Sequence, residues 1–372
     1  MKFLFSPETW EGRSAAKSAT PDTARTSSRE CASTAIRSGT LGTIATFVTC
    51  AGLFLAADAG TAGAQSTSGA QSLNITPGAR ADAMGRAFVA LPEDATANWW
   101  NPAALADARD RNFSFMHTQL VPGLASDVYY EYLGYRMHLP GWGGVGFSFI
   151  YLGYGKSTAT DDGGRELGVF TSYEVSPQVS IGTELVPGLS AGMTLKYVYV
   201  NLAPDWATPD GQQGSGDTFA ADLAMLYKLK GIPGVGIPLN LAVNVQNLGP
   251  NIAYIDQDES DPIGRNLKLG LAARVFDTST EGQPGLSGVV SYDYNKSLVY
   301  SDETPIHNFG TEIAYQGTFA LRAGYIQDED GNIKDPTFGA GFNISSFTAD
   351  FASVPQAEGL DRVSKYSLSY KF

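Results

Sequence analysis

Apolar and polar residues alternate along most of the chain after residue 110. In residues 219–229, one set of alternate positions carries Phe, Ala, Leu, Met, Tyr and Leu, whereas the other carries Asp222 and Lys228. Residues 239–247 and 267–275 show the same split between aliphatic side chains and Asn, Gln, Lys or Arg. A period of two is the signature of a β-strand. Segments of about nine to eleven residues are also long enough to cross a bilayer at a tilt.

The pattern predicts about fourteen such strands, joined by loops and turns. The strands are expected at residues 111–121, 127–138, 143–155, 170–185, 189–202, 218–229, 239–249, 265–276, 286–296, 306–316, 318–327, 336–344, 347–354 and 364–372. An even number of strands of this length favours a closed antiparallel transmembrane β-barrel over residues 111–372. A soluble β-sandwich is the alternative, but its strands are typically about five or six residues long.

The connections between these strands alternate in length. Residues 155–165, 203–217 and 250–264 are long and polar, whereas residues 186–188 and 345–346 are tight turns. Long loops on one side and short turns on the other are typical of outer-membrane barrels. Both chain ends of the barrel then fall on the short-turn side, which we expect to face the periplasm.

The composition agrees with a barrel better than with a helical membrane protein. Charged residues make up 17% of the 372 residues, below the roughly 25% of soluble domains, and mean hydropathy is only -0.11. A barrel hides its apolar face at every second position. The net charge of -13 makes nucleic acid an unsuitable partner.

Residues 1–64 have the organisation of an export signal. Residues 41–57 carry no charge, follow a region with several basic residues, and precede the sequence Ala62-Gly63-Ala64. This order predicts a Sec signal peptide; the alternative, a transmembrane anchor, would be at the lower limit of a spanning length. The leader is unusually long, so translation is expected to begin nearer Arg37. Both cysteines, Cys31 and Cys50, precede the expected cleavage site, so the mature protein would hold no disulfide.

A short linker, residues 65–77, leads into a compact stretch rich in small residues, 78–110. Asn101 followed by Pro102 indicates a helix start, because Asn caps a first turn and Pro is tolerated at the first helical position. Residues 79–91 follow no strict period. On local chemistry alone, this stretch is either a short connecting helix with an aromatic lid at Trp99 and Trp100 or a plug.

This stretch also resembles the opening signature of the PorV/PorQ family, outer-membrane barrels related to the FadL hydrocarbon transporters. The matching residues are Gly78-Ala79-Arg80, Met84-Gly85, Ala87-Phe88-Val89-Ala90, Asp94-Ala95 and Trp100-Asn101-Pro102-Ala103. The resemblance implies that residues 78–110 form a hatch inside the pore. The hatch or gate residues that it implies are Arg80, Met84, Gly85, Trp100, Asn101 and Pro102.

The same resemblance implies two possible functions. In one, the barrel is an accessory, cargo-handling component of type IX secretion, whose partners are the translocon and secreted proteins. In the other, it is a FadL-like channel that passes hydrophobic or small solutes and is gated by the hatch. The polar set of strand positions would face the lumen and holds Lys196, Asp222, Lys228, Lys268, Arg274, Asp293, Glu312, Arg322 and Asp350. These charges would either pair with one another and with the hatch or line a solute path, and they argue against a long-chain lipid.

The last strand carries a candidate assembly signal. Tyr366, Leu368, Tyr370 and Phe372 share one face, which resembles the signal read by the outer-membrane barrel assembly machinery. Left open, this edge would be prone to aggregation, so closure against the first strand is expected. Outer-membrane lipid and the assembly machinery are therefore the expected partners.

Candidate chemistry is sparse, and we expect neither an enzyme nor a cofactor. The histidines, His117, His138 and His307, lie near predicted strand ends, outside any catalytic motif. Two acidic loops, residues 256–261 and 328–332, carry oxygen ligands at alternate positions, but neither matches a twelve-residue calcium loop. Solvated surface loops are the preferred interpretation.

Overall fold

The computed structural model describes residues 68–208, 211–231, 236–255, 259–279, 285–357 and 359–372. The expected signal peptide, both cysteines and the first half of the acidic loop 256–261 lie outside these residues. The structured chain begins with short helices and continues as strands. The helices are η1 (Gln71–Leu73), α2 (Ala79–Ala83), α3 (Ala97–Trp100), η2 (Pro102–Asp107) and, between two strands, η3 (Asp205–Ala207).

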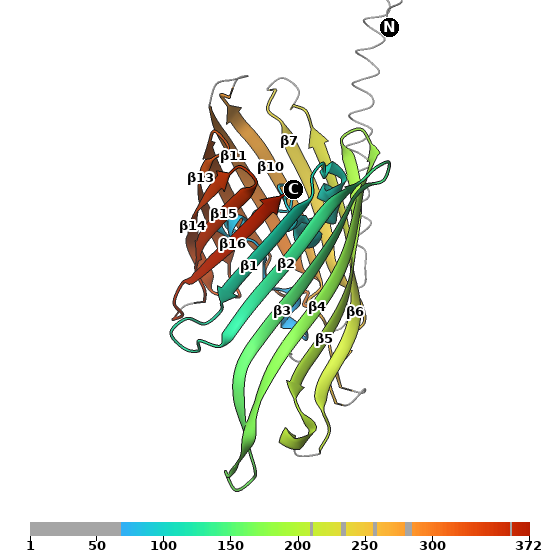
Figure 1. The fold of residues 1–372 in the computed structure, drawn as a ribbon, viewed down its shortest axis with the longest axis vertical. Coiled ribbons are helices and arrows are strands. Elements are labelled where there is room, and N and C mark those ends of the chain that lie inside the picture. The colour runs from blue at the N-terminus through green and yellow to red at the C-terminus, as the bar shows by residue number, and fades with distance from the viewer. Residues whose placement is uncertain (1–67, 209–210, 232–235, 256–258, 280–284, 358) are drawn as a thin grey trace, which may run out of the picture. The chain divides into compact units, whose positions relative to one another are not determined.

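Fourteen long strands form one closed antiparallel sheet, as the sequence predicts (Figure 1). They are β1 (Asn112–Gln119), β2 (Val128–Leu139), β3 (Gly143–Thr160), β4 (Glu166–Val186), β5 (Leu189–Ala203), β6 (Gly214–Leu229), β7 (Leu239–Leu248), β10 (Asn266–Asp277), β11 (Leu286–Ser297), β12 (Ile306–Tyr315), β13 (Phe319–Asp328), β14 (Ile333–Ile344), β15 (Phe347–Val354) and β16 (Val363–Lys371). Each strand pairs with its neighbours in the chain, and β7 pairs with β10 across a loop that contains the short hairpin β8 (Ile252–Ala253) and β9 (Ser260–Asp261).

The barrel closes between its first and last strands. β1 and β16 pair from Asn112 opposite Lys371 to Thr118 opposite Lys365. This pairing satisfies the backbone groups of both edges, which a membrane would otherwise leave without partners. Among the described residues, the helices are all too short or too polar to span a bilayer.

The alternation of side chains follows the two faces of the wall. On β4, Gln178 and Ser180 are buried in the lumen, whereas Val179 and Ile181 point outward and are 49% and 38% exposed. The same outward face carries most of the exposed Phe, Leu and Tyr side chains of the other strands. An apolar outer face and a polar inner face are what a lipid-embedded barrel requires.

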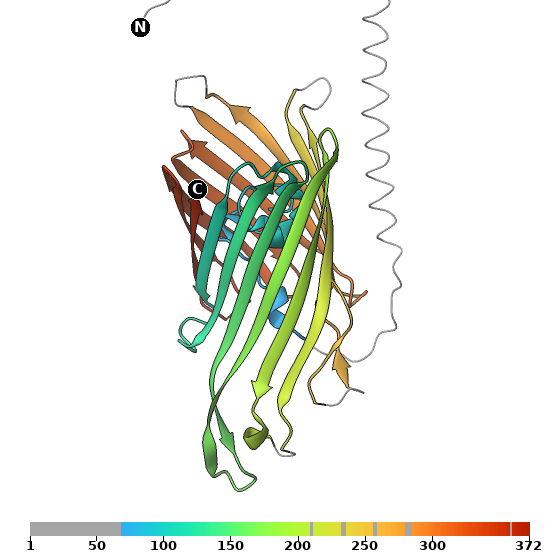
Figure 2. The same ribbon diagram turned by 45° about the vertical axis from the view of Figure 1, so that its right-hand side comes forward.

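Several strands run further than the alternation indicates. The predicted loop 155–165 is a strand pair for most of its length, since β3 and β4 stay paired as far as Thr160 opposite Glu166. Likewise, β6 begins at Gly214 and not at 218, and β14 begins at Ile333 and not at 336. These extensions are rich in Gly, Ser, Thr and charged residues, so their backbones pair without an apolar face to reveal them. Figure 2 shows the resulting long β3–β4 hairpin in green.

The two ends of the barrel can therefore be named by their connections. The long-loop end carries the β3–β4 hairpin, η3 and the β8–β9 loop, and it lies at the bottom of Figures 1 and 2. The C-terminal end carries the tight turns β4–β5, β12–β13 and β14–β15 and the end of β16.

Residues 68–110, here called the inner segment, fill the interior of the barrel (blue to teal in Figures 1 and 2). Met84, Phe88, Trp99, Trp100 and Leu105 are fully or almost fully buried. They pack in one cluster with wall residues that include Met116, Tyr130, Tyr132 and Ile150. The main hydrophobic core thus lies between the inner segment and the wall, with most of its large wall side chains on β1–β3.

Candidate functional site

Asn101 and Pro102 start a helical turn, as the sequence predicts, and the turn is the 3-10 helix η2. The Asn101 side-chain oxygen accepts a hydrogen bond from the Ala103 amide at 3.0 Å. Its amide nitrogen donates to the carbonyl oxygens of Val89 and Met225, at 3.0 and 3.3 Å. One buried side chain therefore caps the helix, bridges two parts of the inner segment and ties both to β6 of the wall.

Glycines in the wall let the inner segment approach the strands at backbone distance. A Cβ atom on Gly192 of β5 would lie 2.3 Å from the Ala103 nitrogen, and one on Gly324 of β13 would lie 2.1 Å from the Gly85 nitrogen. Gly85 itself has φ +64, and a Cβ atom on it would clash with backbone atoms of β12 and β13. Any side chain at these positions would push the inner segment away from the wall.

Polar side chains of the wall bind the backbone of the inner segment. The Asp293 carboxylate accepts hydrogen bonds from the amides of Phe88 and Val89, at 2.7 and 2.9 Å. On the other side, Asn244 and Gln246 donate to the carbonyl oxygens of Trp100 and Trp99. The inner segment has little regular structure, so these wall side chains replace the partners that a helix or strand would supply.

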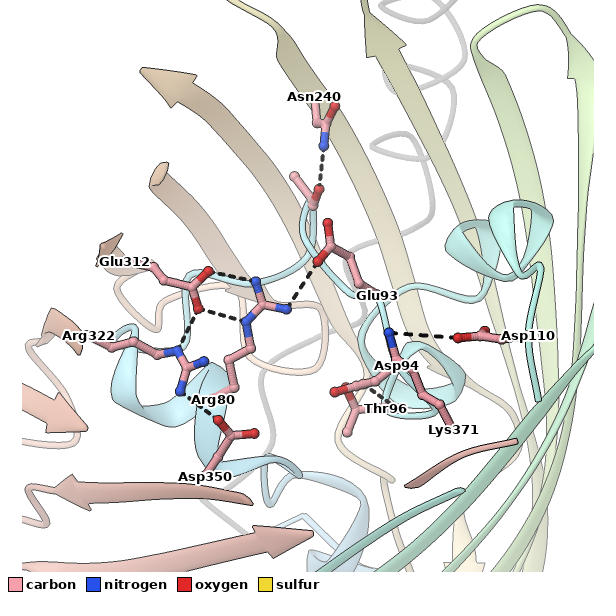
Figure 3. A network of polar contacts seen from close by, with 11 residues as sticks. Arg80, Glu93, Asp94, Thr96, Asp110, Asn240, Glu312, Arg322, Asp350 and Lys371 are labelled. Carbon is pink, nitrogen blue, oxygen red and sulfur yellow. Dashed lines mark hydrogen bonds and ion pairs between the residues drawn. The ribbon is translucent and has the colours of Figure 1, made fainter. Parts of the chain in front are cut away.

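A chain of charged side chains, of which Glu312, Arg322 and Asp350 are buried, anchors the inner segment near the C-terminal end (Figure 3). Arg80 makes two hydrogen bonds to Glu312, both 2.9 Å long. Glu312 also accepts from Arg322 at 2.6 Å, and Arg322 pairs with Asp350 at 2.7 Å. Glu93, which also belongs to the inner segment, forms an ion pair with Arg80 at 3.3 Å. We call these five residues the Arg80 cluster.

The electrostatics around Arg80 favour its charged guanidinium. Burial alone lowers the pKa of Arg80, but Glu312 and Glu93 outweigh it and hold this pKa above the usual value. A planar guanidinium bound at two points by one carboxylate is both strong and directional. The cluster therefore fixes α2 against β12, β13 and β15.

A second group of charges lies further along the lumen. Lys196 pairs with Asp222 at 2.8 Å, with both side chains fully buried. The Lys268 ammonium lies 5.2 and 5.5 Å from the rings of Trp99 and Trp100, within range of a cation–π interaction. This contact places a positive charge against the aromatic pair of α3.

A third group faces the long-loop end. Asp82 of α2 pairs with Lys365 of β16 at 2.7 Å and with Arg86 at 3.2 Å. Asp82 and Lys365 are buried, whereas the Arg86 side chain is 29% exposed. Arg86 has φ 66, a conformation that is uncommon outside glycine.

Cavities remain on both sides of the inner segment. One of 220 Å³ lies at the C-terminal end and is bordered by the Arg80 cluster. Two others, of 280 and 300 Å³, lie at the long-loop end and share Asn74, Thr76 and Arg86 in their walls. We call the 280 Å³ cavity the vestibule.

The structure places each residue singled out in the sequence. The gate candidates Arg80, Met84, Gly85, Trp100, Asn101 and Pro102 all lie in the inner segment, and all but Arg80 are buried. Of the lumen charges, Lys196, Asp222, Lys268, Glu312, Arg322 and Asp350 are buried, as is Asp293. Tyr366, Leu368 and Phe372 are 59%, 56% and 72% exposed, and Tyr370 packs against Phe347 at a ring distance of 4.6 Å.

Two of the expected lumen charges lie elsewhere. Arg274 is half exposed and pairs with Asp277 near the end of β10, where the register with β11 shifts and the strict alternation ends. Lys228 is 44% exposed and pairs with Asp107 at the C-terminal end. Both positions follow the alternation, but they lie where the strands leave the enclosed part of the lumen.

Sequence reasoning missed Lys365 and Glu174. Glu174 of β4 accepts hydrogen bonds from the amides of Gln71 and Ser72 at the start of η1. Both residues occupy inward positions of predicted strands, so the alternation of β4 and β16 is the signal that could have revealed them. His117 and His307 contact Glu131 and Tyr292. Within the described ranges, no group of three or more His, Cys, Asp or Glu side chains is arranged to hold a metal.

The closed sheet, the apolar outer face and the polar lumen together define an outer-membrane β-barrel. The model of the family described as type IX secretion system protein PorV matches residues 59–302. The chain therefore belongs to the PorV family. A comparison with curated proteins finds no match.

A comparison with solved structures finds similar proteins. The toluene transporter TodX of Pseudomonas putida is similar with a TM-score of 0.50 at 14% identity, over 79% of this chain and 97% of TodX. The toluene transporter TbuX of Ralstonia pickettii gives a TM-score of 0.49 at 13% identity, over 79% of this chain and 98% of TbuX. At such identities, the likeness to TodX concerns the fold alone.

Proposed function

We propose that this barrel is an accessory, cargo-handling component of type IX protein secretion. The observation that carries the proposal is the match of the PorV family model to residues 59–302. The filled lumen supports it, because a barrel whose interior is bonded to its own inner segment is suited to present surfaces to other proteins. In this role, the protein would receive secreted proteins at the cell surface.

The proposal includes an orientation. The C-terminal end, with its tight turns, would face the periplasm, and the long-loop end would face the outside, as in other outer-membrane barrels. The β3–β4 hairpin and the loop that carries Trp206 would then extend beyond the membrane. Trp206 is 48% exposed and packs edge-on against Phe170 of β4, so this extension offers an apolar contact surface to cargo.

Secretion in the organism of origin tests this role. Removing the gene should leave proteins with the type IX C-terminal domain inside the cell, and the intact chain should restore their appearance on the surface. A matched control is a chain with Lys228→Gln, which changes an exposed ion pair at the opposite end. Normal surface display without the gene would overturn the proposal, and so would a genome that lacks the translocon.

A channel for small solutes is the second candidate. The observation that favours it is the pair of cavities of 280 and 300 Å³ at the long-loop end, which are separated from the 220 Å³ cavity by the inner segment. Movement of the inner segment around Gly85 and Asn101-Pro102 would join them. The polar and charged lining favours hydrophilic solutes over hydrocarbons. Uptake by vesicles that contain the purified barrel distinguishes this role, since a secretion accessory needs no solute flux.

A further inference from the structure

We propose that the vestibule is a binding site for a small hydrophilic anion, a hydroxylated molecule that carries one carboxylate or phosphate group. The vestibule has a volume of 280 Å³ and opens toward the long-loop end, between the inner segment and the first residues of β10. Sites for small molecules range from about 300 to 1,000 Å³. The cavity therefore suits a ligand of monosaccharide size.

Basic side chains dominate the charge of this cavity. Among the described residues, Arg86, Arg265 and Lys268 contribute to its lining, and the acidic contribution comes from Glu303. Arg86 also borders the neighbouring 300 Å³ cavity, together with Lys365. The chain as a whole carries a net charge of -13. An excess of positive charge in the vestibule is therefore not expected from the overall composition. Such a concave basic surface attracts anions.

The carboxylates near these cations, Asp82 and Asp293, already accept hydrogen bonds or form ion pairs within the protein. Asp82 pairs with Lys365 and also accepts a hydrogen bond from Thr76. Asp293 accepts the amides of Phe88 and Val89. Neither carboxylate borders the vestibule. A ligand in the cavity would therefore meet the cations and not their acidic partners.

Donors remain available in the wall. Among the described residues, the Arg86 guanidinium bonds to Asp82 through Nε, which leaves its two terminal nitrogens for a ligand. Trp99 also contributes to the lining of the cavity, while its indole nitrogen is buried away from solvent.

The remaining polar wall fits hydroxyl groups. Amide side chains surround the cavity, namely those of Asn74, Gln246, Asn247, Asn266, Asn295 and Asn308. Amides both accept and donate hydrogen bonds, as sugar hydroxyls do. The combination of cations, amides and the Trp99 ring therefore points to a hydroxylated acid and away from a hydrocarbon.

Binding to the refolded mature barrel in detergent tests this site. The probes are glucose 6-phosphate, glucuronate, inorganic phosphate and neutral glucose, and the readouts are titration calorimetry and intrinsic tryptophan fluorescence. We expect saturable binding of glucose 6-phosphate or glucuronate, which also tells phosphate from carboxylate. Glucose should bind at least about tenfold more weakly, because it lacks the charge-assisted hydrogen bonds.

Matched variants locate the binding. Arg86→Gln should weaken binding about tenfold or more, whereas Arg274→Gln, an exposed arginine outside the cavity, should leave it unchanged. Heat-dependent gel mobility checks that each variant is folded, and Arg265→Gln replaces Arg86→Gln should the latter fail to fold. Absence of binding by every probe, equal binding of glucose, or equal loss with Arg274→Gln would each overturn the proposal. The outcome does not depend on whether the protein serves secretion.

Discussion

The two ends of the lumen use charge in different ways. At the C-terminal end, the ion pairs of the Arg80 cluster connect α2 to three strands, and Glu312, Arg322 and Asp350 are nearly excluded from solvent. At the long-loop end, Arg86 is partly exposed, and the cations line cavities of 280 and 300 Å³. At the C-terminal end, the charged side chains are bound to one another in ion pairs. At the long-loop end, part of the positive charge remains available to bind a ligand.

This difference follows from how many acids each end supplies. In the Arg80 cluster, two arginines meet Glu312, Asp350 and Glu93, so every cation has an anionic partner. At the long-loop end, Asp82 is shared by Arg86 and Lys365. Removing a partner from a buried network is far more costly than removing one from a solvated pair. We therefore interpret the C-terminal end as an anchor and the long-loop end as a receptive surface.

Deleting residues 78–105 should have the largest effect, because it removes both arrangements at once. The intact barrel should be closed in planar bilayers, and the deletion should open a polar path from end to end. Single-channel conductance and solute uptake measure this, with heat-dependent gel mobility as the check on folding. If neither form conducts, the lumen is packed shut and the channel function is excluded; if both conduct equally, the inner segment is no barrier.

Glu312→Ala tests the anchor. It leaves Arg80 and Arg322 buried with fewer acidic partners, so we expect a loss of about 3–5 kcal/mol in the free energy of unfolding. Urea unfolding in detergent measures the loss. Lys228→Gln is the control, since its pair with Asp107 is about half exposed and should contribute about 0–1 kcal/mol. Equal effects of the two substitutions would contradict the anchor.

Asp293→Ala tests the middle of the lumen. The substitution removes the acceptor of two buried amides, those of Phe88 and Val89, and each orphaned donor should cost about 1–3 kcal/mol. Hydrogen exchange of these two amides should accelerate together with the loss of stability. Asp293→Asn keeps one acceptor oxygen and should be milder. Unchanged exchange in Asp293→Ala would mean that the carboxylate does not hold this part of the inner segment.

Of the three substitutions in the lumen, Arg86→Gln should have the smallest effect on stability, about 1 kcal/mol, because Asp82 keeps Lys365 and Thr76 as partners. The same urea unfolding measures it beside Glu312→Ala. A loss as large as that of Glu312→Ala would show that Arg86 is part of the anchor, and the contrast between the two ends would disappear.

Much of the fold could be predicted from the sequence. The alternation in segments such as 219–229 and 239–247 predicts the strands, because a lipid-embedded wall must change polarity at every residue. The tight turns and the even strand count lead to a closed barrel. The helix start at Asn101-Pro102 was also predictable, because the capping is local and involves the Asn101 side chain and the nearby Ala103 amide.

The extensions of β3, β4 and β6 could not be predicted in the same way. Their polar residues carry no alternation, and only the pairing of two backbones makes them strands. The exposure of Arg274 was equally hidden, since it keeps the inward alternation but lies near the end of β10, just before the register with β11 shifts. Register depends on the neighbouring strand and not on the residue itself.

By itself, the sequence determined which residues face lipid and which face the lumen, because that choice depends on a period of two within one strand. Only the tertiary structure decided which charges meet. Arg80 and Glu312 are 232 residues apart in the chain, and their contact depends on the stagger of the strands and on the path of the inner segment. The same long-range geometry gives each arginine of the Arg80 cluster its own acidic partners, whereas Arg86 shares Asp82 with Lys365 and borders the vestibule.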